Sequence, residues 1–343
     1  MEPLKLLEEF VGAIGPPGEE RQIREALSAK VSYLGLTPET DAKGNLLVKL
    51  GSSDKPKVVV TAHLDEIAMI VRRIESDGRL SVTSLGGLFP WKIGEGPVQI
   101  LGDEIRLSGV LSFGSIHTLD AAASARRGVS EPISWEMGRV FTGITPEKLV
   151  EAGVRPGTRV VVHPQRRQLF GFGDFIASYF LDDRADLVAW LLALEMLKDS
   201  KLDVLFLASV GEEVGGEGAS YALQTIRPDV CIALELGPFV NDAPVELSDL
   251  PTVWTTDSYA AMTSNDGKLI SKIAESLEMK IQFQSLSRGG SDASCAASRG
   301  LCARPITLGI PMENTHGFEI IHKNSMNQLA ILTSELLKIL AKE

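Results

Sequence analysis

The sequence predicts an α/β protein with a mixed central sheet, helices on both faces of the sheet, and an inserted small β-barrel-like domain. Two observations predict it. Apolar strand-like runs alternate with amphipathic helical stretches near both ends of the chain. Between about residues 75 and 168, short β-like pieces, glycines and turn residues are frequent instead. We therefore expect a larger α/β domain from residues 1–74 and 169–343, and an insert from 75–168.

The first part of the chain predicts two helices and two strands. Residues 3–13 have helical apolar spacing, and the Gly-Pro-Pro-Gly run at 15–18 ends that helix. A second amphipathic stretch follows at 19–35. Residues 45–50 and 57–61 are strand-like, and the latter is a continuous apolar run, typical of a strand buried on both faces.

The insert predicts short strands with one short helix. Its strand-like pieces lie at 79–85, 98–102, 104–113 and 158–164, and the helix at 144–154.

The last part returns to alternating strands and helices. Strands are expected at 202–210, 230–236 and 301–308, and helices at 184–197, 218–225, 268–277 and 325–341. Such alternation indicates a sheet covered on both faces.

Composition excludes several classes of protein. The 343 residues carry a net charge of −11, with no basic run, so binding to a nucleic-acid backbone is not expected. No apolar run reaches the ~18 residues of a membrane span. The N-terminus MEPLKLLEEF lacks the features of a signal peptide, so the cytoplasm is the expected location. The three cysteines form no CxxC motif and predict neither a disulfide framework nor a cysteine zinc site.

Polar residues at predicted strand ends are the candidates for chemistry, because such loops carry the functional groups of α/β sheets. His63 and Asp65 directly follow an apolar strand, and residues two apart on a strand share a face. One of them can ligate a metal while the other orients it. Alone, the pair is equally readable as a strand-end histidine beside a surface acid.

Asp182 and Asp183 open a predicted helix. An aspartate there is either a helix N-cap or a metal ligand, and two adjacent acids can divide these roles.

Glu212 and Glu213 follow the strand LDVLFLASV and precede a glycine-rich turn. Two adjacent acids there repel each other unless a cation lies nearby. A metal explains both, with one carboxylate as ligand and the other as a general base. An exposed acidic turn is the alternative.

Two further candidates stand near later strands. Glu235 is a lone acid within VCIALEL and needs either a metal or a basic partner. His316 lies in a loop after an apolar strand, and His322 competes with it for a ligand role. Together the candidates supply nitrogen and oxygen ligands without thiolate, which suit zinc, manganese or cobalt.

The order of these motifs resembles the M42 family of metallo-aminopeptidases over nearly the whole chain. AHLDEIAMIV, LDDRAD, GEEVGGEGA and GGSDAS followed by GIPMENTHGFE are similar to that family's successive motifs. The β-rich insert matches in position.

This resemblance implies two divalent metal ions per subunit, with zinc expected first and cobalt or manganese as alternatives. By similarity, His63, Asp182 and Glu235 hold one metal, while Asp182, Glu213 and His316 hold the other. Glu212 is then the general base that acts on metal-bound water, and Asp65 orients His63. The resemblance also implies peptide substrates cleaved at the N-terminus and self-association, from dimers to dodecamers, through the insert.

The sequence departs from the family pattern at three places. Glu235 stands where aspartate is usual, Ala-Asp follows Asp-Asp-Arg, and His-Gly-Phe-Glu replaces a more usual His-Ser start. These departures bear on substrate preference more than on the metals. Ser287, Arg288 and the turn at 289–292 are expected near the specificity pocket, where Arg288 either favours acidic side chains or forms a surface ion pair.

Alternative functions remain open at this point. A carboxypeptidase or N-acyl deacylase can use the same site. A glycosidase acid pair leaves His63 and His316 without a role. A non-catalytic assembly protein would have no need of the full ligand set, and no GxSxG motif supports a serine hydrolase.

Overall fold

The larger sheet has eight strands and forms around an apolar strand, β3 (Val58–His63), whose residues are all buried. The structure is a computed structural model that describes residues 1–53 and 55–342. The strand order of the eight-stranded sheet is β1 (Glu39–Thr40), β2 (Leu46–Lys49), β12 (Val204–Ser209), β3, β13 (Val230–Pro238), β16 (Arg304–Met312), β14 (Thr252–Thr256) and β15 (Gln282–Ser285). The mixed α/β fold predicted from the sequence is confirmed.

The four central strands run parallel, which brings their carboxyl ends to one edge of the sheet. Strand β3 pairs in parallel with β12 and β13, and β13 pairs in parallel with β16. Ser209 lies opposite His63 in this register, and Glu235 lies opposite Gly309. Strands β2 and β14 join on either side as antiparallel neighbours. The polar residues that follow β3 and β12 therefore meet at the same edge.

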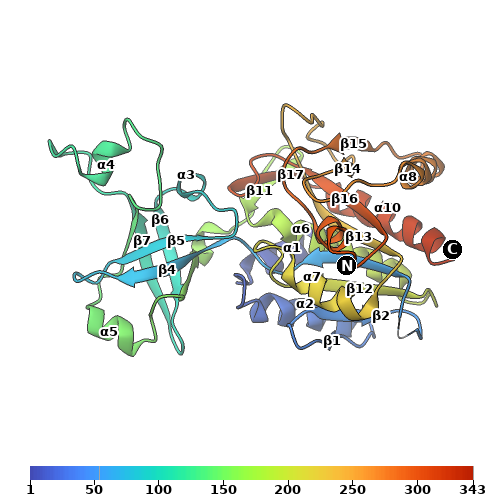
Figure 1. Cartoon of the computed structure of the whole chain (residues 1–343), viewed down its shortest axis with the longest axis horizontal. Helices are drawn as coiled ribbons and strands as arrows, with labels where there is room; N and C mark the ends of the chain where they lie inside the picture. Colours follow the sequence, from blue (N-terminus) through green and yellow to red (C-terminus); the bar gives the residue numbers. More distant parts are fainter. Residues whose placement is uncertain (54, 343) are drawn as a thin grey trace.

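Helices cover both faces of the sheet because successive side chains of its strands point to opposite sides (Figure 1). Val58 and Val60 pack into the larger core, whereas Val59 packs into a smaller one. The larger core takes α1 (Pro3–Gly12), α2 (Arg21–Tyr33), α6 (Leu181–Leu197), α8 (Ser264–Ser276) and α10 (Ser325–Leu340). The smaller core takes α7 (Glu217–Ile226) and α9 (Asp292–Ser298).

A closed barrel stands beside the sheet with a separate core (Figure 1). Its strands follow the order β4 (Ala68–Ile74), β5 (Leu80–Leu85), β8 (Arg139–Phe141), β7 (Arg106–Ser112), β6 (Gly96–Leu101) and β9 (Arg159–Val162). Short helices α3 (Pro90–Ile93), α4 (Ser124–Arg127) and α5 (Pro146–Glu151) lie in its loops. Strand β4 precedes the expected boundary at residue 75 but pairs with β5 and β9. We therefore propose that the insert begins before Ala68.

The junction between the two parts contains a buried ion cluster. Glu66 accepts two hydrogen bonds from Arg167, at 2.9 and 2.7 Å, and one from Arg184 at 2.8 Å. These three side chains are almost fully buried. Arg167 follows the 3₁₀ helix η1 (Pro164–Arg166). The chain then forms β10 (Phe170–Phe172) and β11 (Phe175–Tyr179), which make a three-stranded sheet with the later strand β17 (Phe318–His322).

Some elements were not expected from the sequence. Helix α9 begins where we expected only a turn, because Ser291 and Ser294 form a reciprocal capping box. Edge strands such as β15 were missed because polar residues interrupt their apolar pattern. Within the described residues, no helix is both long and apolar enough to cross a membrane.

Candidate metal centre

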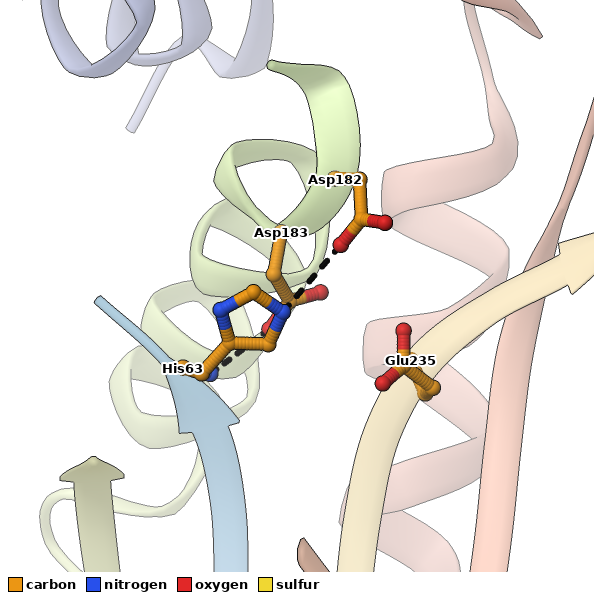
Figure 2. Close-up of side chains that lie close together, drawn as sticks. All are labelled: His63, Asp182, Asp183 and Glu235. Carbon is orange, nitrogen blue, oxygen red and sulfur yellow. Dashed lines mark hydrogen bonds and ion pairs between the residues drawn. The ribbon is translucent and has the colours of Figure 1, made fainter. Parts of the chain in front are cut away.

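The first group of candidate ligands lies at the carboxyl edge of the sheet. His63 ends β3, Glu235 lies late in β13, and Asp182 and Asp183 begin α6. Atoms of these four side chains all lie within 4.8 Å of one another (Figure 2). His63 Nε2 is 3.1 Å from Asp182 Oδ1. The fold thus brings residues from three distant segments to one point.

The start of α6 is irregular, which turns both aspartates toward the sheet. Phe180 has a φ of 63° before the helix, and Asp182 and Asp183 have non-helical backbone angles. Phe180 occupies the N-cap position of this helix, and its side chain makes no capping hydrogen bond. Instead, Asp183 Oδ2 accepts the backbone N–H of His63 at 2.7 Å (Figure 2). The acid beside Asp182 therefore holds β3 rather than the helix end.

The second group consists of Asp182, Glu213 and His316. His316 Nε2 lies 3.4 Å from Asp182 Oδ2 and 3.6 Å from Glu213 Oε1. Asp182 belongs to both groups, and its two oxygens face different histidines. His322, the competing candidate, belongs to neither group. Its ring packs edge-on against the ring of Phe175, with the two ring centroids 5.5 Å apart.

Asp65 holds the turn that carries the paired glutamates. Its Oδ1 and Oδ2 accept the backbone N–H groups of Glu212 and Glu213 at 3.0 and 3.1 Å. His63 Nδ1 lies 3.6 Å from Asp65 Oδ1, but it is closer to the backbone oxygen of Asp65, at 3.1 Å. The sequence suggested the contact with His63 but gave no sign of the contact with the glutamate turn.

Glu319 was not singled out in the sequence, yet it joins the two groups. Its buried carboxylate accepts the backbone N–H of Asp182 at 3.0 Å and that of His316 at 2.8 Å. Burial and the nearby charge of Asp182 raise the pKa of Glu319 to about 8. Glu319 ends the His-Gly-Phe-Glu departure noted in the sequence, but the sequence did not show its role, because its partners are backbone groups of a distant helix start and a loop.

The carboxylates of the site are buried together, and their pKa values show the consequence. Burial raises the pKa of Glu212 and Glu235 well above the ordinary value, and neighbouring acids add to it. Burial and Asp182 raise the pKa of Glu213 to about 7. Burial by itself lowers the pKa of His63, but the surrounding aspartates have the larger effect in the opposite direction. The pKa of His63 therefore lies well above its ordinary value. The site is therefore short of positive charge.

The donor set fits divalent metal ions. The two groups offer imidazole nitrogens and carboxylate oxygens, and within each group these atoms lie within 4.8 Å of one another. Asp183 Oδ1 is buried and has no hydrogen-bond partner among the described residues. Thiolate takes no part: the three cysteines are free and buried, and burial raises the pKa of Cys295 to about 12. A cation would offset the crowded negative charge.

The candidate ligands line a cavity of about 610 Å³. Glu212 lines it beside them. The rest of its wall includes Pro238, Val240, Trp254, Tyr259, Leu286, Ser287 and Arg288, as well as Asp242 and Cys295. Ser287 and Arg288, which we expected near the specificity pocket, line this cavity. The cavity has room for a side chain next to the metal groups.

Comparison with known proteins gives consistent matches. The family model for M42 glutamyl aminopeptidase matches residues 44–332. The lysyl aminopeptidase of Pyrococcus furiosus is 26% identical over 317 residues, covering 91% of this chain and 90% of that protein. The glutamyl aminopeptidase of Lactococcus lactis is 26% identical over 314 residues, covering 89% and 86%.

A solved structure of the TET1 peptidase of Pyrococcus horikoshii, which can assemble into a tetrahedron or a large octahedral shell, has the same fold. Its TM-score to this chain is 0.86 at 25% identity, covering 97% of this chain and 98% of that one. The similarity therefore includes both the sheet and the barrel.

Proposed function

The chain belongs to the M42 glutamyl aminopeptidase family, and from this premise we propose that it removes N-terminal residues from peptides with two divalent metal ions bound. It is a hydrolase of the aminopeptidase class. The observation that carries the proposal is that Asp182 belongs to both ligand groups, with one oxygen facing His63 and the other facing His316.

We assign the ligands from the two groups. His63, Asp182 and Glu235 would hold one metal, and Asp182, Glu213 and His316 the other. Zinc is the first candidate, with cobalt and manganese next, because imidazole and carboxylate donors suit all three. When bound, such a pair of ions lowers the pKa of a water molecule and polarises the carbonyl of the scissile bond.

Glu212 is the proposed general base. It lines the cavity beside the ligands, and its backbone is fixed by Asp65. Burial raises its pKa, so that the carboxylate can accept a proton from the attacking water. The same carboxyl group then donates this proton to the amine that leaves. Asp65, beneath the turn, holds Glu212 in position for both transfers.

Cleavage at the N-terminus rather than the C-terminus is supported by the family and by the relatives, which are aminopeptidases. Asp182, Glu212, Glu213 and Glu235 line the cavity together with both histidines. Two bound dications would balance the charge of these four carboxylates, so the charge of the site does not by itself favour either end of a peptide. Peptides blocked at one end or the other distinguish the two reactions.

Self-association is part of the proposal. The Pyrococcus horikoshii relative assembles into closed shells. The barrel of this chain exposes large apolar side chains, among them Trp91, Ile116 and Val129, at 57%, 66% and 73% of their surface. Exposed apolar clusters of this kind mark contact surfaces between proteins. We propose that copies of this chain meet through the barrel and work in the cytoplasm.

A substrate panel tests the proposed function. Purified enzyme is assayed on amino-acid anilides, free peptides, and peptides blocked at either end, before and after chelation and with zinc, cobalt or manganese restored. We expect release of N-terminal residues that is lost on chelation and recovered with metal. Cleavage only of C-terminal residues or of acyl groups would contradict the proposal and favour the carboxypeptidase or deacylase alternative.

A further inference from the structure

A loop of the barrel reaches into the metal centre. This segment, Gly86–Lys92, follows β5 and runs into α3. The backbone oxygen of Gly87 lies 2.9 Å from Nδ1 of His316, a residue 229 positions later in the chain. An imidazole whose Nδ1–H donates to a carbonyl keeps its Nε2 free to bind a metal. Nε2 is the atom that faces Asp182 and Glu213.

Both glycines of the segment pack directly on candidate ligands. A Cβ at Gly87 would lie 2.8 Å from Nδ1 and from Cε1 of the His316 ring. A Cβ at Gly86 would lie 3.3 Å from the Cβ of Glu213, and Gly86 has a φ of 88°. No side chain fits at Gly87 unless the imidazole moves. The barrel backbone thus forms a wall against which the second ligand group rests.

Lys92 extends the same contact to the loop that carries His316. Its Nζ donates to Oδ1 of Asn314 at 2.6 Å, and Nδ2 of Asn314 donates to the backbone oxygen of Phe318 at 2.9 Å. Asn314 and His316 have φ values of 61° and 59°. Non-glycine residues rarely adopt this conformation without support from their surroundings. Lys92 supplies such support from the barrel.

The segment is anchored chiefly in the barrel, and Tyr179 of strand β11 adds a contact from outside it. Leu88 is buried in the barrel core, and its backbone oxygen accepts the indole N–H of Trp135 at 3.1 Å. At the end of α3, the backbone oxygen of Ile93 accepts hydrogen bonds from Arg166 and Tyr179. The position of Gly87 and Lys92 therefore follows the position of the barrel.

We propose that the barrel is a working part of the metal centre: Gly87 and Lys92 are positioning residues that fix the tautomer and orientation of His316. Metal affinity of the group Asp182, Glu213 and His316 then depends on the docking of the barrel against the sheet domain. The inference rests on the proposed function, because it takes this group as metal ligands.

The test is a Co²⁺ titration of the metal-free full-length chain, followed by visible absorption and by metal content after gel filtration. The variants are Gly87→Ala and Lys92→Met. Gly171→Ala is the matched control for the first, since Gly171 has no atom within 4 Å of an added Cβ. Lys148→Met, on the barrel helix α5, is the control for the second.

We expect the wild-type chain and both controls to bind two Co²⁺. In Gly87→Ala, one of the two should bind roughly 10–100-fold more weakly. Lys92→Met should weaken the same ion by a smaller factor. Loss of the positive charge of Lys92 would by itself strengthen the binding of a dication. Weaker Co²⁺ binding by Lys92→Met would therefore indicate a positioning role, and stronger binding a purely electrostatic one.

Two outcomes would overturn the inference. Two Co²⁺ bound by both variants as tightly as by the controls would refute the role of the barrel and leave the proposed function intact. Fewer than two Co²⁺ bound by the wild-type chain would refute the proposed function and the inference with it. If Gly87→Ala melts well below its control, Lys92→Met decides alone, because it removes one hydrogen bond and adds no atom to the packed interface.

Discussion

Oδ1 of Asp65 lies 3.0 Å from the backbone nitrogen of Glu212 and accepts its N–H, although 147 positions separate the two residues. Oδ2 of the same carboxylate accepts the N–H of Glu213 at 3.1 Å. One short side chain beyond β3 therefore fixes both the proposed base and a proposed ligand beyond β12. The relative position of these two groups depends on this contact.

Replacement of Asp65 by Asn should impair turnover more than substrate binding. The amide keeps one acceptor but turns an N–H donor toward a second N–H, so one of the two hydrogen bonds is lost. We expect kcat on a leucine anilide to fall roughly 10–100-fold, as for other residues that orient metal ligands. KM should change little, because Asp65 does not line the cavity. Unchanged kcat at equal metal content would contradict the role of Asp65.

Replacement of Glu212 by Gln removes the proton acceptor but keeps the size of the side chain. We expect kcat to fall about 100- to 10,000-fold, the usual contribution of a general base. Metal content, measured by mass spectrometry, should stay at the wild-type value. Glu217→Gln is the control, since Glu217 lies in the following helix and pairs with Lys43. Near-normal turnover of Glu212→Gln with metals bound would assign the base to another group.

The ion cluster at the domain junction should matter for stability. Glu66 forms ion pairs with both Arg167 and Arg184, and all three are almost fully buried. Glu66→Gln removes the ion-pair partner of two buried guanidinium groups, which we expect to cost about 3–5 kcal/mol of unfolding free energy. Urea denaturation measures this cost.

The control for Glu66 is Glu131→Gln, which breaks the exposed ion pair with Arg127. Exposed pairs contribute little to stability because water screens them. The denaturation midpoint of Glu131→Gln should therefore stay near the wild-type value. A Glu66→Gln midpoint equally close to the wild type would show that the junction tolerates the unpaired arginines.

Much of the sheet could be predicted because short stretches of the sequence determine where its strands form. Continuous apolar runs such as Val58–Val60 are typical of central strands, and polar residues that follow them are expected at the sheet edge. His63 and Glu213 were selected in this way, Asp182 at a predicted helix start, Glu235 within an apolar strand and His316 in a loop. The structure brings all five into two groups that share Asp182.

The supporting contacts were not predictable for a physical reason. Glu319, Gly87 and the clamp of Asp65 act on backbone groups of distant segments, which leave no pattern in the local sequence. Glycines such as Gly87 have many local explanations, and only the folded chain shows that an imidazole occupies the space of a side chain. Strand β4 lies before the expected boundary at residue 75, and its pairing partners come later in the chain, so the local sequence does not show that it belongs to the barrel.

Metal binding should release protons. In the metal-free chain, the carboxylates of Asp183, Asp182 and Asp65 raise the pKa of His63 against the lowering effect of burial, and Glu213 raises the pKa of His316. Both imidazoles therefore hold a proton near pH 7 that the metal must displace. Metal affinity should fall as pH falls below these raised pKa values and level off above them.

Calorimetry measures this release. Titration of the metal into the metal-free chain at pH 7, in two buffers with different ionisation enthalpies, gives the number of protons released per metal. We expect a positive number, and the apparent heats should differ between the buffers. Equal heats would mean that the histidines are already neutral in the metal-free chain, contrary to the pKa directions.

Arg288 should influence which N-terminal side chain is preferred. It is exposed, lines the cavity, and forms no ion pair within residues 1–53 and 55–342. The expected surface ion pair is therefore not seen there, and an acidic substrate side chain can take its place. Asp242 also lines the cavity, but its Oδ2 accepts the hydroxyl of Ser287 at 3.0 Å. We therefore expect Arg288 to favour an acidic N-terminal residue, with the carboxylate of Asp242 opposing this effect.

Arg288→Gln should lower kcat/KM for a glutamate anilide by up to about 5-fold relative to a leucine anilide, the range of a solvent-screened ion pair. The effect should appear in KM and shrink at high salt, because the charge acts through the substrate side chain and not on the reaction. Arg227→Gln, an exposed arginine at the end of α7, is the control. A glutamate-to-leucine ratio that is the same for Arg288→Gln and this control would exclude Arg288 from substrate selection and leave the apolar wall around Trp254 to determine it.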